Sequence, residues 1–175
     1  MAVSESRMPS YNEWTLIQNY SDSNAADIFD FDTGVMSHAY DFYKVFIAFC
    51  DTSGLANNMN CRINNISTNT YSTLASSGAK YESTNRWTFF AISGATYANR
   101  DFFAEAIIRG SSLAATKNPT FGITGGSVHF SGGVTWFLAM DGGFQTGDIA
   151  TINRIRVFSD QNAIGKIKLY GMNMS

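Results

Sequence analysis

Few residues of this chain combine the type and the spacing that catalysis needs. The only histidines are His38, in an expected loop, and His129, in a glycine-rich strand. A Ser-His-acid triad is defined by its geometry, and the Gly-x-Ser-x-Gly turn that presents a serine nucleophile is absent from the sequence. The His-x-x-x-His and Cys-x-x-Cys spacings of transition-metal sites are absent too. We therefore expect a protein that is not an enzyme and that holds no metal and no cofactor.

Three aspartates lie close together in the first part of the chain. Asp27, Asp30 and Asp32 could supply several of the oxygen ligands that Ca²⁺ takes. The spacing and the final glutamate of an EF-hand loop are missing, and the residues between the aspartates are mostly apolar, as in a strand. The simplest interpretation places Asp30 and Asp32 on the solvated face of that strand.

The two cysteines are expected to be free thiols. In the run from residue 41 to 50, the apolar alternation places Phe49 on one face and Cys50 on the other. In the next run Cys61 shares a face with Met59 and Ile63, so Cys61 points to the core and Cys50 points away from it. A disulfide between them is therefore not expected, which agrees with a reducing compartment.

The strongest charged pattern lies near the C-terminus, where apolar residues alternate with Arg154, Arg156, Lys166 and Lys168. Two alternating runs around a short polar segment predict a β-hairpin with its turn near Gln161, one face in the core and the other cationic. This register sets Arg154 near Lys168 and Arg156 near Lys166, and like charges facing each other cost roughly 0.2–1 kcal/mol. We therefore expect an acidic group close by, in this chain or in a partner.

Two interpretations of this cationic face are open. It is an ordinary solvated sheet face, or it docks, alone or with the arm at residues 1–12, on an acidic surface of a neighbouring subunit. Charge reversal at Arg154 and Lys168 separates the two, because only the second interpretation predicts weaker assembly by a folded protein.

Aromatic side chains offer another kind of site, a platform on which sugar rings stack. Trp87 begins a strand directly after Arg86 and is the best candidate for an exposed ring, with Tyr81 nearby in the sequence. Trp136 alternates with apolar residues in a core pattern. Aromatic residues at alternating strand positions are more often part of the core, because each ring buries a large apolar area.

The elements that must position these residues are short strands. The chain has 14 Phe, 8 Tyr, 3 Trp and 15 Gly with 15% charged residues, a composition typical of strands and tight turns. We expect an all-β, antiparallel β-sandwich of jelly-roll type in a single domain, residues 14–175, after an N-terminal arm at residues 1–13. The strands expected before the C-terminal hairpin are 14–20, 28–31, 40–50, 59–64, 86–92, 101–109, 120–124, 128–130 and 134–140. The run 40–50 is expected to be central, with a hairpin loop at 52–58 and an exposed loop at 65–84 that has room for a short strand at 71–74.

Charge and hydropathy argue against several classes of partner. The 12 basic and 14 acidic residues form no long run of either sign, which gives no electrostatic footprint for nucleic acid or for an anionic membrane. The sequence has no run of 18 apolar residues, and residues 1–12 lack the apolar core of a secretory signal. We expect a protein made in the cytoplasm whose surface, rich in Asn, Ser and Thr, packs against copies of itself in a homo-oligomer.

Several stretches together resemble a widespread group of tailed-bacteriophage virion structural proteins. They are the strand around Trp14, the run Tyr40–Ile47, the strand Phe102–Ile108 and the ending from residue 152, which closes on Leu169-Tyr170-Gly171. In that group a run ending in Leu-Tyr-Gly and an apolar residue closes a β-sandwich. The resemblance is one of pattern and covers nearly the whole chain from Trp14 onward. It implies a non-enzymatic component of the virion, either a head decoration protein or a tail or fibre module.

The sequence lacks the coiled-coil heptads and shaft segment of a long fibre, so the favoured function is that of a head decoration or cement protein that bridges capsid subunits. One alternative is a tail-fibre or receptor-binding module that recognises host surface glycan through Trp87 and the loop 65–84. A second alternative is a jelly-roll enzyme that degrades polysaccharide. Such an enzyme needs paired carboxylates. The candidates are Glu82, Asp101, Glu105 and Asp141, and their spacing in the sequence does not single out any two of them as a pair.

Overall fold

The structure, a computed structural model, describes residues 13–23, 28–36, 40–53, 57–68, 71–75, 80–92, 100–109, 120–129, 135–137, 140–144 and 151–174. These residues form twelve strands and contain no helix. The strands are β1 (Thr15–Asp22), β2 (Ile28–Asp32), β3 (Phe42–Asp51), β4 (Asn57–Ile63), β5 (Tyr71–Ala75), β6 (Lys80–Thr84), β7 (Trp87–Ile92), β8 (Arg100–Arg109), β9 (Thr120–His129), β10 (Thr135–Phe137), β11 (Met140–Phe144) and β12 (Ile155–Met172). The prediction of an all-β, antiparallel, sandwich-like fold is confirmed.

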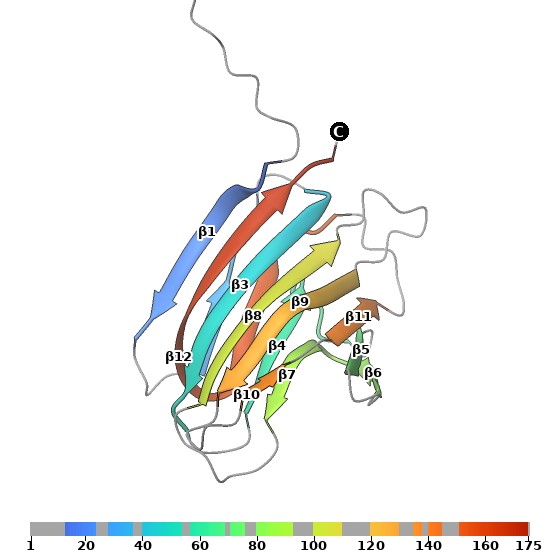
Figure 1. The fold of residues 1–175 in the computed structure, drawn as a ribbon. Helices are drawn as coiled ribbons and strands as arrows, with labels where there is room; N and C mark the ends of the chain where they lie inside the picture. The colour runs from blue at the N-terminus through green and yellow to red at the C-terminus, as the bar shows by residue number, and fades with distance from the viewer. Residues whose placement is uncertain are drawn as a thin grey trace, which may run out of the picture.

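β12 is 18 residues long and belongs to two sheets (Figure 1). Its C-terminal half, from Ala163 to Met172, lies between β3 and β1 in the larger sheet, here called sheet A. Its N-terminal half, from Ile155 to Ser159, pairs with β4 in the smaller sheet, sheet B, and β2 lies on its other side. The hairpin predicted around Gln161 is therefore wrong, because the two alternating runs are the halves of one bent strand.

Side-chain hydrogen bonds at the bend explain why the chain does not turn back on itself. Asn57 Oδ1 accepts hydrogen bonds from the backbone N–H groups of Asp160 and Gln161, both at 3.0 Å. The Ser159 hydroxyl donates to the carbonyl oxygen of Gln161 at 2.7 Å. These bonds satisfy backbone groups that leave the ladder where β12 passes from one sheet to the other.

β3 is an interior strand of sheet A, as predicted, with β12 on one side and β8 on the other. Its inward residues are buried and alternate with residues of the outer face; they are Tyr43, Val45, Ile47 and Phe49. The predicted hairpin from this strand into the next is wrong. β3 and β4 pair with different halves of β12 and not with each other.

Sheet A continues from β8 through β9, β11 and β5 to β6, with β10 beside β9. The two strands predicted within 120–130 form the single strand β9, and the stretch predicted as an exposed loop at 65–84 contains β5 and β6. The sheet curls until β5 meets β7 of sheet B. At this contact the Tyr71 hydroxyl donates to the carbonyl oxygen of Ile66 at 2.9 Å, and its ring lies edge-on to Trp87 with centroids 5.4 Å apart.

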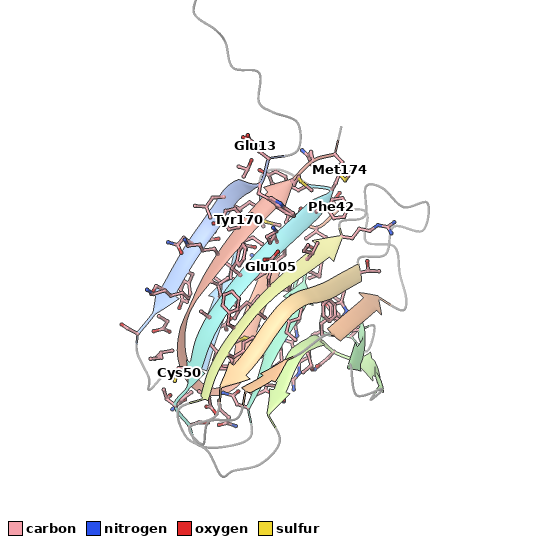
Figure 2. All side chains as sticks on the ribbon, viewed as in Figure 1. Glu13, Phe42, Cys50, Glu105, Tyr170 and Met174 are labelled. Carbon is pink, nitrogen blue, oxygen red and sulfur yellow. The ribbon has the colours of Figure 1, made fainter. Side chains whose placement is uncertain are left out.

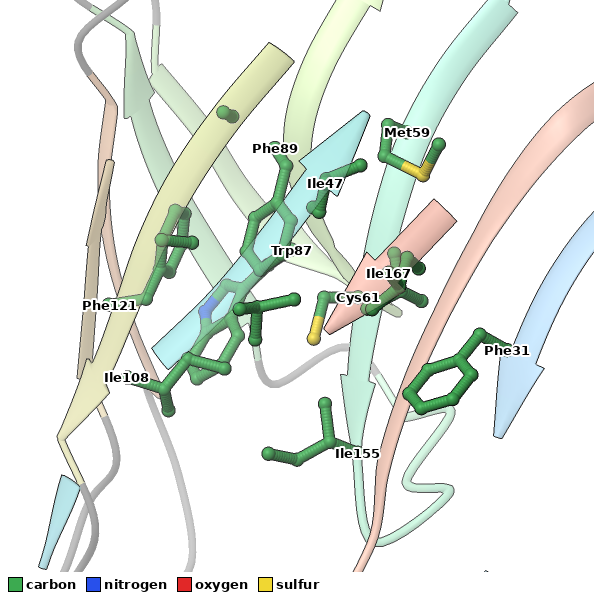
Figure 3. Close-up of a cluster of buried hydrophobic side chains, with 14 of the residues drawn as sticks. Phe31, Ile47, Met59, Cys61, Trp87, Phe89, Ile108, Phe121, Ile155 and Ile167 are labelled. Carbon is green, nitrogen blue, oxygen red and sulfur yellow. The ribbon is translucent and has the colours of Figure 1, made fainter. Parts of the chain in front are cut away.

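The core lies between the two sheets, where aromatic and branched side chains from both inner faces meet. Figure 3 shows Trp87 among the buried side chains of Phe89, Phe121 and Ile108. Cys61 is buried, Cys50 is only partly buried and the two are not joined by a disulfide, which confirms the prediction for the two thiols.

Candidate functional site

The arginines of the predicted cationic face are neutralised within the chain. Arg156 Nε donates to Asp30 Oδ1 at 2.9 Å, and a terminal guanidinium nitrogen donates to Asp30 Oδ2. Arg154 Nε lies 3.4 Å from Asp32 Oδ1. The hydrogen bond to Asp30 raises the pKa of Arg156 and keeps the guanidinium charged. Asp30 and Asp32 are exposed, as predicted, and they are the acidic groups that this face was expected to need; Asp27 lies outside the described residues.

A further acid compensates charge at the bend of β12. Asp160 accepts hydrogen bonds from both terminal nitrogens of Arg86, at 3.0 and 3.1 Å, and from the side-chain amides of Asn58 and Asn60 at 2.7 and 3.1 Å. Three guanidinium groups lie between 4.9 and 6.0 Å from the ring of Phe158, and they belong to Arg62, Arg86 and Arg156. On the outer side of sheet B, Arg86, Arg154 and Arg156 therefore have acidic partners within the chain, and Arg62 Nε donates to the carbonyl oxygen of Asn85 at 3.1 Å.

The two lysines lie on the outer face of sheet A and are not compensated in this way. Lys166 and Lys168 are exposed, and neither forms an ion pair with any residue that the structure describes. Their cross-strand neighbours on β1 are the neutral residues Ser21 and Asn19. The four cations predicted to form one face are therefore in two sheets. The two lysines lie together in sheet A, and the two arginines lie in sheet B.

Apolar side chains share the outer face of sheet A with these lysines. Phe103 on β8 is 50% exposed, and Leu16 on β1 is 51% exposed. Phe46 packs edge-on against Tyr170, with ring centroids 5.8 Å apart. Figure 2 shows Cys50 toward one end of sheet A and Tyr170 toward the other. Exposed apolar side chains on a sheet face that also carries unpaired lysines are found on surfaces that bind another molecule.

A groove with a cavity volume of about 480 Å³ opens on this face at the end where Cys50 lies. Its lining is mainly apolar and includes Ala48, Cys50, Phe103 and Ile164, with Lys166 also among the lining residues. Sequence reasoning missed the groove, because it depends on which residues of four strands become neighbours.

The aromatic platform predicted for sugar binding is not supported. Trp87 is 0% exposed, so its prediction as a surface ring is wrong. Phe89, two residues further along β7, is buried with Trp87. Residues two apart in a strand share a face, so the spacing of these two aromatic residues could have indicated that Trp87 lies in the core. The backbone of Tyr81 lies in β6 opposite Thr73, and its side chain lies outside the description, as does that of Trp136.

The carboxylates considered for catalysis lie on three strands. Asp101 and Glu105 are four residues apart on β8, about 13 Å along the strand, whereas paired glycosidase carboxylates are roughly 5–9.5 Å apart. Glu105 also pairs with Lys44 at 3.2 Å. Glu82 lies on β6 and Asp141 on β11.

Cross-strand register places His129 of β9 opposite Asp101 of β8, which lies opposite Cys50 of β3. Two strand spacings, about 9.5 Å, separate the backbones of Cys50 and His129. The side chain of His129 and the whole of His38 lie outside the description. Within the described ranges, no three His, Cys, Asp or Glu side chains form a group that could hold a metal ion.

No protein-family model, curated protein or solved structure matches this chain. The described residues include no helix long and apolar enough to cross a membrane. The outer face of sheet A is identified as a candidate site from its unpaired lysines and its groove alone.

Proposed function

We propose that this protein is a non-enzymatic structural protein of a bacteriophage virion, and specifically a head decoration or cement protein. The observation that carries the proposal is the outer face of sheet A. There Lys166 and Lys168 have no acidic partner among the described residues, and Phe103 is half exposed. Such a surface is complementary to an acidic and partly apolar surface of another molecule: the apolar contact contributes affinity, and the matched charges contribute specificity and faster association.

The Leu-Tyr-Gly run that contributes to the resemblance has a clear structural role in this fold. Leu169 is buried in the core and Tyr170 packs against Phe46 on the outer face. A Cβ atom on Gly171 would lie 2.4 Å from ring carbons of Tyr40, so a larger residue requires Tyr40 to move. The run anchors the strand shared by both sheets, which supports its use as a signature of the fold. The link to virions rests on the resemblance.

The proposed mechanism is bridging between capsid subunits. A stable interface buries about 800 Å² on each partner, and a subunit that contacts several neighbours adds association free energy that exists only in the assembled lattice. The protein would in this way resist the internal pressure of the filled head. No step of this mechanism needs a reacting group.

Counting the protein in purified particles by quantitative mass spectrometry, with immunogold labelling to locate it, tests the proposal. A high copy number on the head is the expected result. A few copies at the tail tip would replace decoration by a tail or receptor-binding role, and absence from particles would refute a virion role altogether.

A further inference from the structure

The groove on the outer face of sheet A arises from a change of side-chain size along β3. Its outward residues Phe42, Lys44 and Phe46 are large, and they are followed by Ala48 and Cys50, which are small. Cross-strand partners stand about 5 Å apart, so a small residue between large ones leaves a gap above it. The gap lies above Ala48 and Cys50.

The walls and rim of this gap follow from the register. Ala48 lies opposite Phe103 of β8 on one side and opposite Lys166 of β12 on the other, and Lys166 lies opposite Ser21 of β1. Ile164 of β12 lies opposite Cys50. The result is a trough with an aromatic wall, an aliphatic wall and a lysine at its rim. Asp22 of β1 is the one acid among the lining residues, and a second lysine, Lys168, lies one row away.

We propose that this groove receives an apolar side chain from an extended acidic segment of a neighbouring particle subunit. The apolar side chain would fill the space above Ala48, and carboxylates beside it would pair with Lys166 and Lys168. This inference rests on the proposed function in one respect, that the acidic segment belongs to a particle subunit. The apolar and cationic lining of the groove does not depend on the proposed function.

Charge and shape favour this occupant over three others. Residues 1–12 of this chain contain one glutamate and one arginine, so the arm does not complement two free lysines. The groove is bounded by residues as exposed as Phe103, whereas small-molecule sites bury most of the surface of their ligand. A second copy would have to offer an acidic strip, and the four described acids that form ion pairs, Asp30, Asp32, Glu105 and Asp160, are already engaged by cations of their own chain.

The test uses a fluorescein-labelled peptide, acetyl-Glu-Asp-Phe-Asp-Glu-amide, titrated with the full chain in low salt and followed by fluorescence polarisation. We expect saturable binding that weakens about tenfold when the peptide Phe is replaced by Ala, as for a buried anchor residue. Binding should also weaken steeply with added salt. A peptide with Lys in place of each acid should not bind.

Two matched variants locate the binding. Ala48→Trp fills the groove, and Thr120→Trp adds the same side chain at another exposed position of sheet A. Both should fold with unchanged circular dichroism, but only Ala48→Trp should abolish binding. Equal binding by the two variants, or no peptide binding by the wild-type chain, would overturn the proposal.

Alkylation of Cys50 reports on the occupant directly, because the thiol lies in the groove. The acidic peptide should slow alkylation of Cys50 by N-ethylmaleimide, and deletion of residues 1–12 should leave the rate unchanged. Faster alkylation after that deletion would show that the arm fills the groove, and a concentration-dependent dimer lost in Ala48→Trp would show that a second copy does. Either result would overturn the acidic segment as occupant. Peptide binding by a protein that is absent from particles would contradict the proposed function and leave the groove chemistry intact.

Discussion

The two halves of β12 carry the same alternation of apolar and cationic residues, yet they meet different neighbours. In sheet B the adjacent strand β2 supplies Asp30 and Asp32, which bind the arginines at the start of β12. In sheet A the adjacent strand β1 supplies Asn19 and Ser21 opposite the lysines. One half is therefore closed by charges of this chain, and the other half is left open. The comparison teaches that a cationic strand face is structural or available for binding according to the strand beside it.

The largest expected difference between the halves of β12 is in the reactivity of the thiols beside them. Each half pairs with a strand that carries one cysteine. Cys61 lies opposite Val157 and Cys50 opposite Ile164. Burial raises the pKa of the Cys61 thiol, and the reagent reaches it only when the structure opens. Cys50 should react about a thousandfold faster than Cys61 or more. Mass spectrometry of the Cys50→Ser and Cys61→Ser variants measures the alkylation rate of the cysteine that remains in each. In denaturant the two rates should be equal, which is the control. Similar rates in the native protein would contradict the distinction between the closed and the open half.

The next effect concerns the bend that joins the halves. Asp160→Ala removes the acceptor of four hydrogen bonds from Arg86, Asn58 and Asn60. We expect a loss of about 2–4 kcal/mol in the free energy of unfolding, because charged hydrogen bonds are among the stronger ones and their donors are left without a partner. Lys166→Ala should change stability by less than about 0.5 kcal/mol. Urea unfolding of both variants is the measurement, and equal losses would argue that the open half is structural too.

Alkaline pH should destabilise the fold through two buried groups that can lose a proton, Cys61 on β4 in sheet B and Tyr71 on β5 in sheet A. The pKa values of Cys61 and Tyr71 are both raised, chiefly by burial. Above the ordinary thiol pKa of 9.0 the unfolded chain loses a proton that the native chain keeps, so stability falls as pH rises, by up to about 1.4 kcal/mol per pH unit for each such group. In Cys61→Ser the fall should begin only near the ordinary tyrosine pKa of 10.0. Cys50→Ser is the control, and a shift of onset in that variant instead would contradict the assignment.

The smallest expected effect belongs to the exposed arginine pairs. Arg156→Ala breaks the pair with Asp30, whose two side chains are about a third exposed or more. Such pairs contribute roughly 0.2–1 kcal/mol, and high salt should reduce the loss. Thermal unfolding at low and high salt measures it. A loss as large as that of Asp160→Ala would mean that the pair supports the bend as well.

Local pattern predicted much of this fold, because alternation reports which face of a strand is buried. It gave the all-β class, the interior position of β3 in its sheet and the opposite orientations of Cys50 and Cys61. It failed where pairing partners decide the outcome. The alternation of β12 is the same whether its halves pair with each other or with β3 and β4, so it does not distinguish these arrangements. In the observed arrangement Asn57 binds the backbone at the bend.

The candidate site was predicted in part for the same reason. The four cations and the need for an acid were readable from the sequence, and Asp30 and Asp32 are such acids. Which cations those acids reach depends on the position of β2. The groove depends on Phe103, Ala48 and Lys166 becoming neighbours across three strands, and such distant residues carry no joint signal in one sequence.

The most direct test gives the open half the acids that the closed half has. Asn19→Asp with Ser21→Asp places a carboxylate opposite Lys168 and Lys166, and Thr151→Glu with Asn153→Glu makes the same change of charge at other exposed positions. The measurement is the number of copies that each variant contributes to particles when it competes with the wild-type protein. We expect a large drop in copy number for the β1 variant at unchanged or slightly higher thermal stability, and no drop for the control. Equal incorporation of the two variants would contradict the claim that the open face of sheet A binds the particle.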